Sequence, residues 1–130
     1  MRKLVNRLFH LYYRQRYKSI RRFMREPELV QRDVFRSLIQ AAKHTEWGKK
    51  YGFHEIRNRQ TFAQRLPLQE YDDLKPLINR MMRGEKDVLW HGQVRWFSKS
   101  SGTTNDKSKF IPVSSQNLKS CHIKGTWDTM

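Results

Sequence analysis

The sequence predicts an α+β chain, with a helical N-terminal half followed by a hairpin-like strand–loop–strand unit and a last helix. Apolar residues recur at steps of three and four through most of residues 3–82, as in helices that bury one face. After Gly84 the composition shifts to β-branched and aromatic residues, which favour strands. A run of hydroxyl residues and lysines within 97–114 interrupts these strands and predicts the loop.

The first predicted helix covers residues 3–24. Pro27 ends it, because a proline pushes the preceding residue out of the helical region. Pro27 also suits the first turn of a second helix, which we expect Gly48 and Gly52 to stop. The apolar stripes of these two helices are Val5, Leu8, Phe9, Tyr12, Tyr13, Tyr17, Ile20 and Phe23 in the first, and Val30, Val34, Leu38 and Ala41 in the second.

A third helical region is predicted to begin near Thr61, which forms a capping-box pattern with Gln64. Asp72 is the expected N-cap of the following helix. Pro76 would then occupy the fourth helical position, where the N–H has no partner inside the helix. Gly84 is expected to end this helix. Its predicted buried stripe is Leu74, Leu77, Ile78 and Met81.

Residues 88–100 are predicted to form a strand with a turn at His91–Gly92, and residues 109–113 a second strand. Pro112 indicates a sheet edge or a strand end. Ser114 or Ser115 is expected to cap the last helix. Two short strands do not make a stable sheet alone, so we expect the sheet to continue in sequence outside this chain.

The chain of 130 residues carries a net charge of +15 and is 37% apolar without glycine, whereas globular chains are roughly 45–50% apolar when glycine is counted. We therefore expect it to pack against a further part of the same protein. Residues 1–25 contain no acid and nine basic residues, which are Arg2, Lys3, Arg7, Arg14, Arg16, Lys18, Arg21, Arg22 and Arg25. They predict a solvated helix face, or a face for an acidic surface, RNA or an anionic membrane. Because no nucleic-acid signature accompanies the charge, nucleic acid is not an expected partner.

Other features restrict the function classes. No run of about 18 apolar residues predicts a membrane-spanning segment, and no signal-peptide pattern begins the chain, so we expect a cytoplasmic protein. Cys121 is the single cysteine and forms no internal disulfide. The five histidines show no ligand spacing, so no metal site is predicted.

The loop contains Ser100, Ser101, Gly102, Thr103 and Thr104, with lysines after them. A glycine-containing turn with hydroxyl donors and lysine charge can hold a phosphate. The same residue types also build ordinary hairpin turns, so both interpretations remain. The pattern G-x-x-x-x-G-K-[ST], counted from the glycine, fails because a lysine stands at position 107.

Together, "SSGTT" and the downstream "KFIP" resemble the phosphate-binding signature of the acyl-adenylate-forming enzymes. The position of Lys109 is most similar to the auxin-responsive acyl-acid amido synthetase family, bacterial members included. Residues 43–53, 62–85 and 88–104 resemble that family in order and spacing, and the resemblance extends from Pro27 onward.

This resemblance implies an ATP-dependent ligase that uses Mg²⁺, a small carboxylic acid and an amine or amino acid. The acid attacks the α-phosphate of ATP, giving an acyl-adenylate and pyrophosphate, and the amine then displaces AMP. The loop would offset the phosphate charge. Asn105–Asp106 departs from the family, whose loops often carry a glycine there. The implied ATP-binding residues are Ser100, Ser101, Gly102, Thr103, Thr104 and Lys109.

Family members are several times longer than this chain. We therefore expect residues 1–26 to form a basic amphipathic helix, and residues 27–130 to form the N-terminal portion of a larger adenylate-forming domain, truncated at its C-terminus. The missing C-terminal part would be its partner, and the chain alone would not adenylate an acid, which an ATP–pyrophosphate exchange assay checks. The alternatives are a coenzyme A ligase of the same superfamily and a small basic module that binds nucleic acid or a membrane surface.

Overall fold

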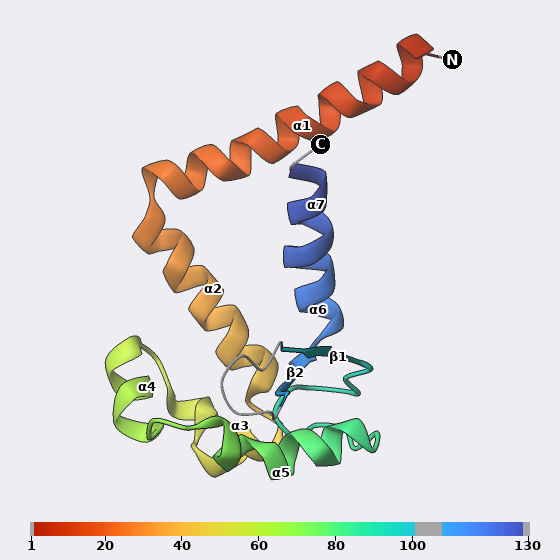
Figure 1. The fold of residues 1–130 in the computed structure, drawn as a ribbon. Coiled ribbons are helices and arrows are strands. Elements are labelled where there is room, and N and C mark those ends of the chain that lie inside the picture. Colours follow the sequence, from red (N-terminus) through yellow and green to blue (C-terminus); the bar gives the residue numbers. More distant parts are fainter. Residues whose placement is uncertain (1, 101–107, 129–130) are drawn as a thin grey trace. The chain divides into compact units, whose positions relative to one another are not determined.

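The computed structural model describes residues 2–100 and 108–128 (Figure 1). The chain separates into two compact units, Met1–Leu38 and Ile39–Met130. Within the described residues the first unit is helical, and the second combines short helices with a two-stranded antiparallel sheet. The predicted α+β class and order of elements are confirmed.

The first unit contains α1 (Arg2–Arg25) and most of α2 (Pro27–Ala42). The helix predicted over residues 3–24 is confirmed, and the break falls immediately before the proline, as expected. Across this break, the Arg22 guanidinium contacts the Asp33 carboxylate at 2.8 Å. The Glu26 N–H donates to the Arg22 carbonyl at 2.8 Å and the Val30 N–H donates to the Glu26 carbonyl at 3.1 Å, so Glu26 ends one helix and begins the next.

The stripe predicted for α2 is wrong in its position around the helix. Of its four residues, Val34 and Leu38 are exposed and the other two are half-buried, whereas the buried residues of α2 are Ile39 and Ala42. These two lie in the second unit, where the last turn of α2 meets the core. Packing of that one turn, rather than the apolar period along the helix, determines which face is buried.

A tight corner joins α2 to α3 (Glu46–Lys50). Thr45 is completely buried; its hydroxyl donates to the Ala42 carbonyl at 2.7 Å and accepts the Gly48 N–H at 2.9 Å. A Cβ on Gly48 would lie 2.1 Å from the Ala42 carbonyl oxygen, closer than atoms can approach. The prediction that Gly48 stops a helix is therefore wrong: it lies inside α3 and permits close packing. Gly52 does end this segment, with a φ of 62°.

The helices α4 (Arg59–Arg65) and α5 (Tyr71–Met82) begin earlier than predicted, after η1 (Phe53–Glu55). The side chain of Asn58 accepts the Thr61 N–H at 2.8 Å, so Asn58 caps α4 and Thr61 does not.

Glu70 is the N-cap of α5, and its N–H donates to the Asp73 carboxylate at 2.8 Å. The predicted N-cap Asp72 is wrong, and Pro76 lies inside the helix, where it removes one backbone hydrogen bond. The predicted end at Gly84 is confirmed by its φ of 91°. The predicted stripe is also confirmed, with Ile78 and Met81 buried and Leu74 and Leu77 half-buried.

Helix α3 is fixed to the segment that follows α5. The backbone N–H groups of Glu46 and Trp47 donate to the carbonyls of Asp87 and Val88 at 2.7 and 3.1 Å. The Arg80 guanidinium bridges both sides: Nη1 lies 3.0 Å from the Glu46 carboxylate, and Nε lies 2.8 Å from the Glu85 carboxylate. Beneath these contacts, a core cluster comprises Met81, Val88 and Val94, with Leu77, Leu89, Trp90 and Phe97 packed against it.

The sheet consists of β1 (Trp96–Lys99) and β2 (Phe110–Val113), paired from Trp96↔Val113 to Lys99↔Phe110. The strand predicted over residues 88–100 is therefore too long. Residues 88–95 instead form a loop, closed where the Gly92 N–H donates to the Asp87 carboxylate at 2.7 Å, and this loop buries Val88 and Val94. The predicted turn at His91–Gly92 is confirmed by the Gly92 φ of 70°.

The described chain ends in a helical run of α6 (Ser115–Asn117), the π-helical segment η2 (Leu118–Ile123) and α7 (Lys124–Asp128). The Ser114 hydroxyl oxygen caps this helical run by accepting the Asn117 N–H at 3.1 Å. Ser114 is one of the two predicted cap residues. In the part of the chain that the structure describes, no helix is long and apolar enough to cross a membrane.

The corner predicts a specific stability effect for Gly48→Ala. The added methyl group would overlap the Ala42 carbonyl, so we expect a loss of about 1–3 kcal/mol in the free energy of unfolding, measured by urea denaturation. Gly125→Ala is the matched control, because nothing lies within 4 Å of its added Cβ and alanine favours the helix α7. Equal destabilisation by the two substitutions would contradict the packing argument.

The Arg80 bridge predicts a dependence of stability on pH. Its hydrogen bonds lower the pKa values of Glu46 and Glu85 below the ordinary value of 4.5. A lowered pKa in the folded state stabilises the protein above pH 4.5, and this contribution is lost as the pH falls through the folded-state values. Glu46→Gln should therefore lower the melting temperature near neutral pH, and the difference from wild type should shrink below about pH 4.

The control is Glu28→Gln, which removes an exposed carboxylate in α2. Melting temperatures followed by circular dichroism across this pH range compare the three proteins. A constant difference between wild type and Glu46→Gln at every pH would refute the role of the bridge.

Candidate functional site

The predicted phosphate loop joins β1 to β2, and the structure pairs its two ends. The Ser100 N–H donates to the Lys109 carbonyl at 2.9 Å, and the Lys109 N–H donates to the Ser100 hydroxyl oxygen at 3.1 Å. These residues continue the register one step beyond the pair Lys99↔Phe110. The loop therefore leaves and rejoins the sheet at one point, which fixes the distance between its ends.

Of the six predicted site residues, the structure describes Ser100 and Lys109 and brings them together. The other four, Ser101, Gly102, Thr103 and Thr104, lie outside the described residues. The Ser100 hydroxyl accepts a backbone hydrogen bond, which leaves its own proton available for donation. It can therefore hold the loop closed and donate to an anion at the same time.

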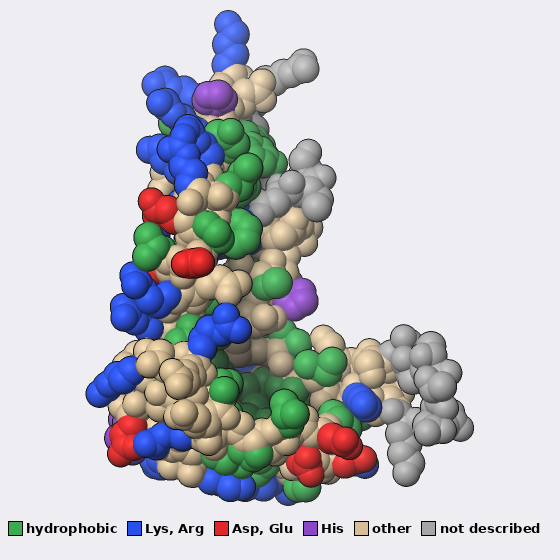
Figure 2. All heavy atoms as spheres, turned by 90° about the vertical axis from the view of Figure 1, so that its left-hand side faces the viewer, with side chains coloured by type: hydrophobic (Ala, Val, Ile, Leu, Met, Phe, Trp, Pro, Cys, Tyr) green, Lys and Arg blue, Asp and Glu red, His purple; other side chains and the backbone are tan. Residues whose placement is uncertain are grey.

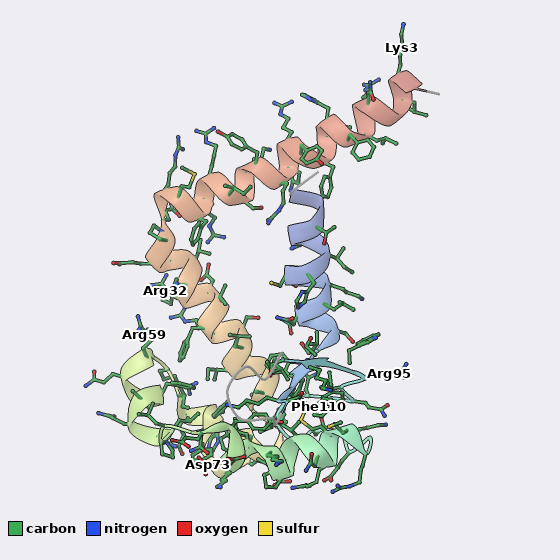
Figure 3. All side chains as sticks on the ribbon, viewed as in Figure 1. Lys3, Arg32, Arg59, Asp73, Arg95 and Phe110 are labelled. Atoms are coloured by element: carbon green, nitrogen blue, oxygen red, sulfur yellow. The ribbon has the colours of Figure 1, made fainter. Side chains whose placement is uncertain are left out.

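Tyr71, the first residue of α5, holds the loop on its C-terminal side. Its hydroxyl oxygen accepts the Phe110 N–H at 2.9 Å, at the point where β2 meets α5 (Figure 3). This N–H belongs to an edge strand and points away from β1, because Lys99↔Phe110 is a pair without mutual hydrogen bonds. The Tyr71 hydroxyl thus gives the Phe110 N–H an acceptor that the sheet does not provide.

The ring of Tyr71 also contacts the closing lysine. The Lys109 ammonium nitrogen lies 5.4 Å from the ring centroid, within the range of a cation–π interaction. One side chain therefore fixes both the backbone after the loop and the cation at its end. Sequence analysis missed Tyr71, and no local pattern marks it, because it binds a residue 39 positions away.

The frame beneath the loop is built from α5 and the core. At the helix start, the bond from the Glu70 N–H to the Asp73 carboxylate fixes where Tyr71 lies. On the other strand, Phe97 packs against the cluster around Met81, near the helix end. Each strand of the hairpin is thus anchored to the same helix, which gives the loop a rigid base.

The chemistry of the described groups fits an anion. Lys109 supplies a positive charge, Ser100 supplies a hydroxyl donor, and a second lysine, Lys99, ends β1. Among the residues that the structure describes, no three His, Cys, Asp or Glu side chains gather as metal ligands. The arrangement can therefore bind phosphate groups by charge and hydrogen bonding.

Comparison with known proteins identifies the family of this chain. The family described as "GH3 family N-terminal domain" matches residues 16–130, starting within α1 rather than at Pro27. Indole-3-acetic acid-amido synthetase GH3.3 of Arabidopsis thaliana is 30% identical over 102 residues, 78% of this chain and 17% of the relative. Jasmonoyl–L-amino acid synthetase JAR6 of Nicotiana attenuata is 28% identical over 92 residues, 70% of this chain and 16% of the relative.

The match thus spans less than a fifth of the length of these relatives. The family match over residues 16–130 includes the whole described hairpin, α5 and the corner that supports them. The family match covers nearly the entire sequence, and the chain belongs to the GH3 family.

Proposed function

We propose that this chain supplies the ATP-phosphate-binding loop of an acyl-acid amido synthetase. The proposed binding residues are Ser100, Ser101, Gly102, Thr103, Thr104 and Lys109. The observation that carries the proposal is the closed base of the loop, where Ser100 meets Lys109 and Tyr71 holds the lysine beside it. A rigid base matters because electrostatic stabilisation depends on donors and charges that are already in position.

The proposed reaction joins a small carboxylic acid to the amine of an amino acid. The relatives are named for indole-3-acetic acid and for jasmonoyl conjugation, and these names support the substrate classes without identifying this chain's substrates. The carboxylate attacks the α-phosphate of ATP and pyrophosphate leaves; the amine then displaces AMP from the acyl-adenylate. The role of this chain is to bind the phosphates and offset their charge. We propose that it acts in the cytoplasm, where ATP is available.

Magnesium accompanies ATP in such reactions, where it is held by the phosphates and one or two carboxylates, and no described carboxylate is assigned to it. We therefore assign no step to the metal here. Lys109 and the loop hydroxyls act on the phosphate oxygens directly, since a lysine places a compact charge without requiring fixed geometry.

The proposal predicts that Lys109→Ala weakens phosphate binding by this chain. Losing a charged hydrogen bond costs about 1.5–3 kcal/mol, so we expect the dissociation constants for ATP and pyrophosphate to rise at least about tenfold. Isothermal titration calorimetry measures both, and adenosine, which lacks phosphates, should give no comparable signal.

The matched control is Lys86→Ala, which removes one exposed positive charge away from the loop. A basic chain attracts ATP without specificity, and that attraction would fall equally in the two variants. Equal effects, or no ATP binding by the wild type, would refute the assignment of the loop.

The contact between Tyr71 and Phe110 predicts a local effect of Tyr71→Phe. The ring remains beneath Lys109, but the Phe110 N–H loses its acceptor, so hydrogen exchange at the Phe110 amide should accelerate at least about tenfold. We expect ATP affinity to fall as well, because the end of the loop is less firmly held. Tyr51→Phe, which keeps the ring that packs at a tilt against Trp47, is the control and should leave both measurements unchanged. Unaltered protection at Phe110 would show that Tyr71 does not hold the loop.

A further inference from the structure

The phosphate loop accounts for none of the basic charge on α1. Six of its nine basic residues fall on one side of the helix, within about 60° of one another when each residue advances about 100°. Figure 2 shows Lys and Arg side chains gathered along this helix, with hydrophobic side chains beside them. The six residues, here called the basic stripe, are Lys3, Arg7, Arg14, Lys18, Arg21 and Arg25.

The side of α1 opposite the basic stripe carries exposed apolar and aromatic side chains, with Arg16 among them. Phe23 on this side is 53% exposed, and Tyr17, at its border with the stripe, is 59% exposed, although residues of these types are usually at least half-buried in folded proteins. Ile20 and Met24 lie near them and are also exposed. This apolar face runs the length of the helix, which has 24 residues and contains no acid.

The two faces together match the physical requirements of a helix that lies in a membrane interface. Such helices place Lys and Arg against anionic headgroups and insert apolar and aromatic side chains between the lipids. Tyrosine suits the boundary between the headgroups and the acyl chains, because its ring is apolar and its hydroxyl can remain hydrated. The Arg21 guanidinium lies 5.9 Å from the centroid of the Tyr17 ring, where basic and aromatic residues meet.

We propose that α1 binds the surface of an anionic lipid bilayer and lies in its interface. Charge complementarity selects this occupant, since a helix that carries nine cations, six of them on one face, and no acid favours an anionic partner. A second copy of α1 would bring like charges together. RNA would neutralise the basic stripe but leave the apolar face in water. A lipid surface satisfies both faces, and the number of charges on α1 makes it lie on the membrane rather than cross it.

The experiment is co-sedimentation of the full chain with lipid vesicles. Vesicles of phosphatidylcholine alone are compared with vesicles that also contain about 30 mol% phosphatidylserine, at about 0.1 M salt. We expect binding to the anionic vesicles to be at least about tenfold stronger. Substituting Lys3, Arg7, Arg14 and Lys18 by glutamine should reduce that binding at least about tenfold, and glutamine preserves helix propensity.

The matched control removes the same charge from the second unit, by substituting Lys75, Lys86, Arg95 and Lys119 with glutamine. It should change vesicle binding less than about twofold, whereas a loss equal to that of the α1 variant would mean that net charge alone is responsible. Melting temperatures of all variants establish that each second unit remains folded.

A third variant separates lipid from RNA. Ile20→Ser combined with Phe23→Ser should weaken vesicle binding at least about fivefold, because the inserted apolar area is lost. Binding to an RNA oligonucleotide would depend on the charges and be unaffected by this change. The proposal is overturned if the wild type does not bind anionic vesicles, or if it binds them but the apolar variant binds equally well.

Discussion

The arrangement of the second unit depends on two hydrogen bonds made by the hydroxyl group of Thr45. The hydroxyl is buried between the Ala42 carbonyl and the Gly48 N–H, and it closes the corner between α2 and α3. This corner directs the first N–H groups of α3 at the carbonyls of residues 87 and 88. Of these two residues, Val88 belongs to the core cluster, and Phe97 of β1 packs against that cluster. A local cap thus determines, through one helix end, where the hairpin begins.

In the candidate site, a single helix likewise makes contacts with two different parts of the unit. Helix α5 contributes its C-terminal half to the core and its first residue, Tyr71, to the loop. Its two ends therefore connect the stability of the unit to the position of Lys109. A phosphate site needs this connection, because a lysine on an unsupported turn would lose conformational entropy on binding. In the proposed phosphate site, Tyr71 would reduce that cost, because its ring already confines the Lys109 side chain.

Sequence analysis succeeded where local patterns determine structure. The break before Pro27, the buried stripe of α5 and the left-handed glycines at positions 52, 84 and 92 follow from local sterics and periodicity. The predicted helix starts were wrong because several polar residues near each start can serve as the N-cap. Asn58 caps α4 and Glu70 caps α5, and both precede the predicted residues. The strand predicted over residues 88–100 was too long, because apolar, β-branched residues indicate a buried position as much as a strand. Val88 and Val94 are buried, but they lie in a loop.

Only part of the candidate site was predictable, because only part of it follows from local structure. The pairing of Ser100 with Lys109 follows once two strands flank a loop, since the register brings its ends together. Tyr71 was not predictable, because its role arises only when α5 packs beside β2. Its position inside the region of family resemblance offered a signal, but no spacing rule assigns a contact over such a separation.

The net charge of +15 combines two different uses of basic residues. In the second unit, Arg80 binds two carboxylates, and both Lys50 and Lys109 lie over aromatic rings, so these cations serve specific local contacts. In α1, the charges form a stripe on a helix without acids, and such a field acts on extended anionic surfaces. A total charge cannot distinguish these uses, whereas the placement of each cation can. The +15 therefore indicates neither phosphate binding nor membrane binding until the charges are located on the fold.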